Sequence, residues 1–169
     1  MRLNEALQYT FGEIRDLTHR LVDGLDADAL AWRPAAEANS IGWLVWHLTR
    51  IEDDHIAAIA GVDQVWSAQN AERFGLPRGT VDTGYGHRPE QVAAVRPSGA
   101  EVLLHYHDRV ADMVQQYLEV AGEEEFNRVI DTSYDPPVTV GVRLISVVGD
   151  AFQHLGQTGY VRGLLHRAG

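Results

Sequence analysis

The chain has 169 residues, carries a formal net charge of -10 and contains no cysteine. The length suits one domain, which we predict to span residues 1–169. The acidic balance argues against a nucleic-acid partner, because phosphate binding requires a basic face. The lack of cysteine excludes disulfides and thiolate metal ligands. Since the N-terminus has no apolar signal core and no apolar run reaches membrane-spanning length, we expect a cytoplasmic protein without a membrane partner.

Apolar residues at alternating spacings of four and three predict a first helix from about Leu3 to Leu25, which ends near Gly24. The expected buried seam of this helix is Leu3, Leu7, Thr10, Ile14, Leu17 and Leu21. A second helix begins after Asn39 or Ser40, either of which can cap it, and runs to about Gly61.

Residues 62–97 form a long, irregular connector that is rich in aromatic residues and arginines. A connector of this length is usually a functional loop or a crossover. We predict a short helical turn near Pro89 to Val95. We also expect the connector to cover the end of the bundle that carries a candidate metal site, with Trp66, Phe74 and Tyr85 lining a pocket there. The alternative is a crossover that packs these aromatics against the side of the bundle.

A third helix is predicted after Ser98 and Glu101, which have the spacing of a capping box, and it ends at Gly122. The fourth helix covers Thr139 to Leu165. Its expected buried stripe is Val142, Ile145, Val148, Phe152 and Leu155. The pattern predicts an all-α fold, a four-helix bundle with a long crossover connector between the second and third helices.

The fourth helix carries polar residues where a bundle core is expected. Asp150 and His154 are four residues apart and therefore share one helical face. Such a pair can bind one metal ion, and His47 beside the seam of the second helix is the candidate third ligand. Two imidazoles and one carboxylate leave coordination positions free, which is typical of a catalytic site.

Several simpler interpretations compete with this one. Asp150 and His154 could be a helix-stabilising pair, and His47 a core histidine. His55 is a rival ligand, although it lies two turns beyond His47. The acidic run of residues 52–54 could orient a ligand histidine or form a solvated face, the latter being favoured for Asp53. The other histidines are expected at the surface or without a partner: His105, His107, His19, His87 and His166.

The stretch LAWRPAAEANSIGWLVWHLTRIEDDHI, together with GDAFQHLGQTGYVRGLL, resembles the DinB-like superfamily. It is most similar to the branch of mycothiol-dependent maleylpyruvate isomerases and other low-molecular-weight-thiol transferases. The resemblance implies a four-helix bundle holding a divalent metal, commonly zinc or nickel. It places the ligands at His47, Asp150 and His154. Many members have histidine at the position of Asp150, and the isomerase branch has glutamate there.

The leading functional hypothesis is a metal-dependent transferase or isomerase that activates a mycothiol-like thiol toward a small electrophilic substrate. Alternatives are a metal-dependent hydrolase using metal-bound water and a non-catalytic, stress-associated metal-binding bundle. A homodimer is compatible with each. Candidate substrate-pocket residues, besides the three aromatics above, are Trp43, Arg73, Arg78, Arg88 and Arg162.

Overall fold

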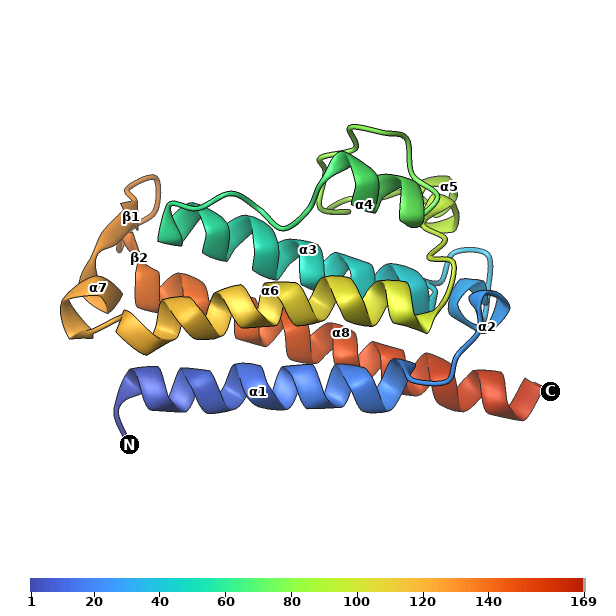
Figure 1. The fold of residues 1–169 in the computed structure, drawn as a ribbon, viewed down its shortest axis with the longest axis horizontal. Coiled ribbons are helices and arrows are strands. Elements are labelled where there is room, and N and C mark those ends of the chain that lie inside the picture. The colour runs from blue at the N-terminus through green and yellow to red at the C-terminus, as the bar shows by residue number, and fades with distance from the viewer. Residues whose placement is uncertain (169) are drawn as a thin grey trace.

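A computed structural model describes residues 1–168, and its framework is a bundle of four long helices. These helices are α1 (Leu3–Val22), α3 (Ile41–Ala60), α6 (Ala100–Val120) and α8 (Val140–Ala168). They lie side by side, with α8 in contact with both α1 and α3 (Figure 1). The expected all-α bundle is confirmed. Within residues 1–168, no helix is both long and apolar enough to cross a bilayer.

The ends of α3 follow local sequence signals. Ser40 is the N-cap, and its hydroxyl accepts a hydrogen bond from the Trp43 amide. Gly61 ends the helix in a left-handed conformation at φ 68°, which glycine adopts without steric cost. Both ends agree with the prediction. At the start of α6, by contrast, the N-cap is Gly99 and makes no side-chain cap hydrogen bond, so the expected capping box is absent.

The buried faces of α1 and α8 differ from those predicted. In α1 only Leu7 and Ile14 of the expected seam are buried. In α8 the expected stripe is largely exposed, with Val142 and Ile145 each 56% exposed and Phe152 40%. The buried stripe of α8 is instead Val140, Leu144, Val147, Ala151, Leu155, Thr158 and Val161. Because α8 has apolar residues on two faces, its periodicity alone does not decide which face packs inward.

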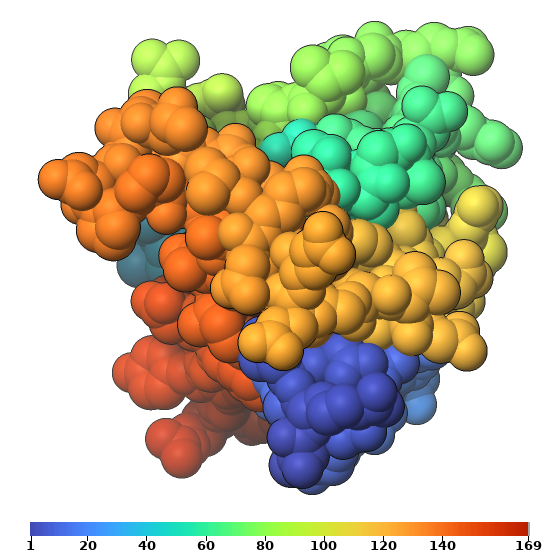
Figure 2. All heavy atoms as spheres, turned by 90° about the vertical axis from the view of Figure 1, so that its left-hand side faces the viewer, coloured from blue at the N-terminus to red at the C-terminus, as the bar shows by residue number. Residues whose placement is uncertain are grey.

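Short helices and two short strands lie in the segments that connect the four long helices. The connector contains α4 (Ala68–Arg73) and α5 (Pro89–Ala94), and the second of these is the predicted helical turn. The other short helices are α2 (Ala27–Ala31) and α7 (Glu123–Asn127). Strands β1 (Val129–Asp131) and β2 (Val138–Thr139) pair antiparallel just before α8. This hairpin, which was not predicted, projects from one corner of the bundle end (orange in Figure 2).

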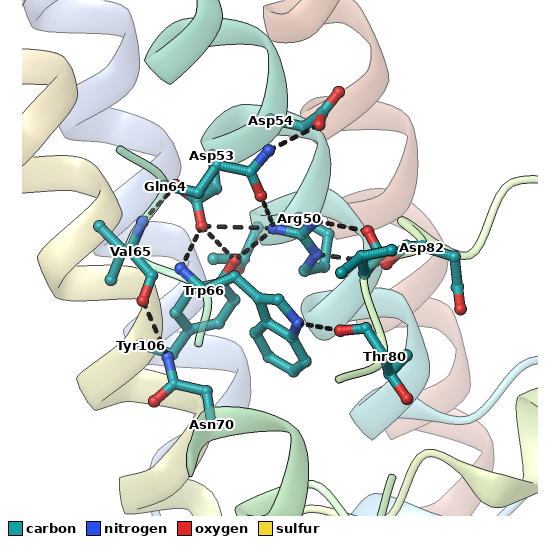
Figure 3. Close-up of polar contacts among 12 residues, drawn as sticks. Arg50, Asp53, Asp54, Gln64, Val65, Trp66, Asn70, Thr80, Asp82 and Tyr106 are labelled. Carbon is teal, nitrogen blue, oxygen red and sulfur yellow. Dashed lines mark hydrogen bonds and ion pairs between the residues drawn. The ribbon is translucent and has the colours of Figure 1, made fainter. Parts of the chain in front are cut away.

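The connector is tied to α3 by a buried polar cluster (Figure 3). The carboxylate of Asp53 accepts hydrogen bonds from the amides of Val65 and Trp66 at 2.9 and 2.8 Å. Arg50 donates to the carbonyls of Val81 and Asp82 at 3.1 and 3.3 Å. Because both side chains are fully buried, these contacts hold the two ends of residues 65–82 against the same two turns of α3.

Candidate metal centre

Three side chains from two helices converge at the α3–α8 interface. His47 comes from α3, and Asp150 and His154 lie one turn apart on α8. One ligand atom of each lies within 4.8 Å of the other two. The Nε2 atom of His154 is 3.5 Å from Oδ1 of Asp150. The structure therefore brings together the three residues that the sequence singled out.

Both histidines are oriented by an oxygen on the far side of the ring. Nδ1 of His47 is 2.5 Å from the carbonyl oxygen of Thr83, and Nδ1 of His154 is 3.1 Å from Oε1 of Gln157. Because these oxygens only accept hydrogen bonds, each Nδ1 must be the protonated donor. Each neutral ring then carries its lone pair on Nε2. This arrangement is typical of metal-binding histidines.

Trp43 forms a wall of the site. Its ring stacks on His47 with centroids 4.7 Å apart and planes 14° apart, and meets His154 edge-on at 6.2 Å. Its indole N–H donates to Nδ1 of His87 at 3.1 Å. Nε2 of His87 in turn lies 2.8 Å from Asp82. The expectation that His87 has no partner is wrong, since this histidine links the connector to the wall.

A close backbone approach lets the connector reach His47. Gly84 has φ of 92°, and a Cβ at this position would lie 2.7 Å from the Trp46 ring and 3.0 Å from Nδ1 of His47. Only glycine fits, because its neighbours are packed ring atoms. Sequence reasoning missed both Thr83 and Gly84. The one available signal was the glycine-rich run that contains Gly84 and Gly86.

Electrostatics suit a cation in this cluster. Burial lowers the pKa of His47 and thereby favours its neutral, ligating form. Burial also opposes charge on His154 and Asp150. Even so, their mutual hydrogen bond and attraction raise the pKa of His154 and lower that of Asp150. Among the described residues, the buried Oδ2 of Asp150 has no hydrogen-bond partner, so the donor set fits a divalent ion, which would displace the proton of His154.

The comparisons with known proteins agree with this fold. Residues 10–158 match the DinB superfamily. The chain belongs to the DinB superfamily. A crystal structure titled as a conserved protein from Enterococcus faecalis is 31% identical, has a TM-score of 0.87 and is matched over 98% of both chains. A search of curated proteins gave no match. Membership of the DinB superfamily supports a metal interpretation of the cluster but says nothing about the thiol branch.

The other pocket candidates lie elsewhere. Trp66 and Phe74 are buried in the core, where their rings pack against Tyr106 at 5.1 and 6.0 Å. Tyr85 is 92% exposed. The prediction of an aromatic pocket over the site is therefore wrong. Two of its three predicted residues belong to the hydrophobic core, because the connector folds against α3 and α6. It is the backbone of Thr83 and Gly84 that covers the metal-ligand cluster.

None of the four arginine candidates makes a hydrogen bond or ion pair with the three metal-ligand candidates. Arg162 donates to the carbonyl of Arg20 at the end of α1, and Arg78 forms an exposed ion pair with Glu72 at 3.6 Å. Arg88 is exposed at the start of α5, and Arg73 is exposed at the end of α4. The role of these arginines in binding a substrate therefore stays a prediction that the structure does not support.

The acidic run and the remaining histidines also differ from expectation. Asp53 is fully buried and not solvated, and Asp54 accepts a hydrogen bond from Gln64. His55 contacts Arg143 and is not part of the cluster. His105 is exposed as expected, whereas His107, two residues later, is completely buried. His19 pairs with Asp108 at 2.9 Å, and His166 accepts from Arg162 at 3.5 Å.

Proposed function

We propose that this protein is a divalent-metal-dependent transferase or isomerase that activates a low-molecular-weight thiol for attack on a small electrophile. The observation that carries the proposal is the geometry of the cluster. His47, Asp150 and His154 all approach from α3 and α8, and the side chains of Asp150 and His154 are 36% and 15% exposed. A cation held there would keep coordination positions accessible from solvent.

The chain itself narrows the chemistry. It contains no cysteine, so it cannot provide its own sulfur nucleophile. A divalent ion, zinc or nickel being the expected ones, would supply a positive charge that lowers the pKa of an external thiol and keeps it as thiolate. The likeness to mycothiol-dependent enzymes of the same superfamily adds mycothiol as the first thiol to test.

The residues of the chain have separable tasks in this scheme. Asp150 and the Nε2 atoms of His47 and His154 would hold the cation. The carbonyl of Thr83 and the amide of Gln157 fix the two imidazole rings. The indole of Trp43, stacked on His47, excludes water from one side of the cluster. An electrophile would approach from the exposed side of α8, next to Asp150.

The test combines metal analysis with turnover. Protein purified without an affinity tag is analysed for bound metal. It is then assayed with mycothiol, bacillithiol or glutathione, each with a panel of electrophiles. We expect turnover only when metal and a thiol are both present, and loss of turnover in His47→Ala and Asp150→Ala. His105→Ala, which changes an exposed histidine on α6, is the matched control and should keep full activity.

Two outcomes would replace the proposal. Ester or amide turnover that needs the metal and no thiol would indicate a metal-dependent hydrolase. Metal binding without thiol binding and without turnover of either kind would indicate a non-catalytic metal-binding bundle.

A further inference from the structure

A polar pocket lies at the end of the α3–α8 seam away from the candidate metal centre, next to the β1–β2 hairpin. Its volume is about 480 Å³, and its lining includes His55 and Ile59 of α3, Arg128 and Asp131 before and within β1, and Arg143 of α8. In Figure 1 the hairpin stands at the bundle end where α3 finishes and α8 begins. None of these residues has a role in the proposed metal centre.

The pocket and the metal centre lie along one continuous seam. On α3, His47, Ile51 and His55 follow one another at spacings of four and therefore share a face. On α8, Arg143, Asp150 and His154 are spaced by seven and four, which again defines one face. The two rows face each other at both ends: His47 meets His154 at one, and His55 meets Arg143 at the other.

The length of this seam sets the expected length of a ligand that reaches from one end to the other. Arg143 precedes Asp150 by two helical turns, which corresponds to about 10 Å along the helix axis at 1.5 Å per residue. Between the two polar ends, Ile51 of α3 is partly exposed and Ser146 of α8 is exposed, whereas Val147 is buried beneath them. A molecule with one end at the metal centre would thus pass over Ile51 and Ser146 before it reached the arginine.

Arg143 keeps hydrogen-bonding capacity for such a molecule. Its Nη1 donates to Nδ1 of His55 at 3.1 Å, and burial lowers the pKa of His55, so this imidazole is a neutral acceptor. The nearest carboxylate oxygen, Oδ2 of Asp131, is 3.7 Å from Nη2, beyond hydrogen-bond distance. The side chain of Arg143 is 24% exposed, and across residues 1–168 its other N–H groups have no hydrogen-bond acceptor.

The second arginine of the pocket already has its Nε–Nη2 edge occupied by a carboxylate. Arg128 donates to both carboxylate oxygens of Glu125 and to the carbonyl of Ile59. Asp131 is also partly engaged, since its Oδ1 accepts from the amide and hydroxyl of Ser133. Arg143 is therefore the group that can offer a planar pair of donors to an incoming carboxylate or phosphate, with Asp131 as its competitor.

We propose that Arg143, oriented by His55, binds the anionic group of a ligand whose other end lies at the metal centre. The proposal rests on the proposed function and narrows the thiol to anionic ones, so bacillithiol and glutathione, which carry carboxylates, should bind more tightly than mycothiol, which has no carboxylate or phosphate. The expected ligand is a thiol with a carboxylate or phosphate about 10 Å from its sulfur, separated from it by a largely apolar or amide chain.

The first experiment tests the anion site without any thiol. Acetate and inorganic phosphate are titrated separately into the metal-loaded protein, and the side-chain N–H resonance of Arg143 is followed by NMR. We expect this resonance to shift with at least one of the two anions, which also tells a carboxylate site from a phosphate site. Asp131→Asn removes the competing carboxylate and should tighten anion binding several-fold. No response of Arg143 in either protein would overturn the proposal.

The second experiment tests the reach of the site with matched thiols. The cobalt-loaded protein is titrated with 8-mercaptooctanoate and 8-mercaptooctanol, and with 3-mercaptopropionate and 3-mercaptopropanol, by thiolate-to-cobalt absorption. We expect the long acid to bind about tenfold more tightly than the long alcohol, and the two short thiols to bind alike. Arg143→Gln should abolish the preference for the long acid, and Arg109→Gln, on the exposed side of α6, should preserve it.

The outcomes of the two experiments separate the two proposals. If metal-loaded protein binds none of the thiols but Arg143 still responds to anions, the proposed function fails and the anion site remains. If the thiols bind without any preference for the long acid, the anion site fails and the proposed function remains.

Discussion

Two consecutive residues of α3, Glu52 and Asp53, place carboxyl groups in the interior of the bundle with opposite consequences. Asp53 is 0% exposed and accepts hydrogen bonds from two backbone amides and from the hydroxyl of Tyr106, next to the guanidinium of Arg50. Glu52 is 1% exposed, and among the described residues its Oε1 has no partner. Its Oε2 is 3.9 Å from Nδ1 of His107, too far for a hydrogen bond.

The two carboxyl groups therefore contribute differently to the stability of the folded state. Around Asp53, the donors and the ion pair offset the cost of burial, so the group acts as an anchor for the connector that covers His47. Around Glu52, burial is uncompensated and raises the carboxyl pKa to about 8, while burial lowers the pKa of His107 to about 4. Near neutral pH both of these groups are therefore uncharged, and folding stability must depend on pH through them.

Breaking the anchor should have the largest effect. Asp53→Asn removes the charge opposite the buried Arg50 and two acceptor sites, so we expect a loss of about 3–5 kcal/mol in the free energy of unfolding by urea denaturation. Asp54→Asn, the same change one residue later on a partly exposed side chain, should cost below about 1 kcal/mol. Equal losses in the two variants would show that Asp53 is not a special anchor.

Removing a metal should produce the next largest effect. Asp150 is an intermediate case, because within residues 1–168 its buried Oδ2 has no hydrogen-bond partner, and a bound cation would coordinate this oxygen. With free metal at 100–1,000 times the dissociation constant, chelation should lower the unfolding free energy by about 3–4 kcal/mol. His154→Ala should not respond to the chelator, whereas His166→Ala, an exposed histidine near the end of α8, should respond like the wild type. A chelator response retained in His154→Ala would remove this histidine from the ligand set.

Replacing Glu52 by glutamine should change how the free energy of unfolding depends on pH on the alkaline side. The folded state holds its proton up to about pH 8, whereas an unfolded glutamate, with its ordinary pKa of 4.5, releases the proton at much lower pH. The stabilising contribution of Glu52 is thus complete below pH 4.5 and is lost as the pH rises through 8, with about 3–4 kcal/mol of the loss falling between pH 5 and pH 8. Glu52→Gln should flatten this decline, so its advantage over the wild type in thermal unfolding should grow from pH 5 to pH 8. An exposed control, Glu13→Gln, should leave the wild-type slope intact.

Replacing His107 should alter the acidic side, with the smallest effect of the four. The folded state keeps this ring neutral down to about pH 4, whereas an unfolded histidine takes up a proton below its ordinary pKa of 6.5. Stability should therefore fall as the pH drops from 6.5 toward 4, by roughly 2 kcal/mol at pH 5. His107→Gln should remove this part of the acid sensitivity, and His105→Gln, on the exposed face of the same helix, should not. Superimposable pH profiles for the two variants would contradict the assignment.

Features of this protein that depend on near neighbours in the chain were predictable from the amino-acid sequence. The Ser40 cap and the Gly61 end of α3 follow from residues within one turn, and the Asp150–His154 pair follows from helical spacing. His47 could be added because it flanks an apolar seam that had to face another helix. These signals were enough for the all-α class and for the three residues of the candidate metal centre.

Features that depend on contacts between distant segments became visible only in the folded molecule. The carbonyl that orients His47 lies 36 residues away at Thr83, and the hydroxyl next to His107 lies 58 residues away at Thr49. Likewise, α8 has two apolar faces. Its packing against α1 and α3 buries one of them, and the sequence periodicity had predicted the other. Capping and spacing act within a turn of helix, whereas burial is assigned by the partner that covers a surface, and that partner is not encoded nearby in the chain.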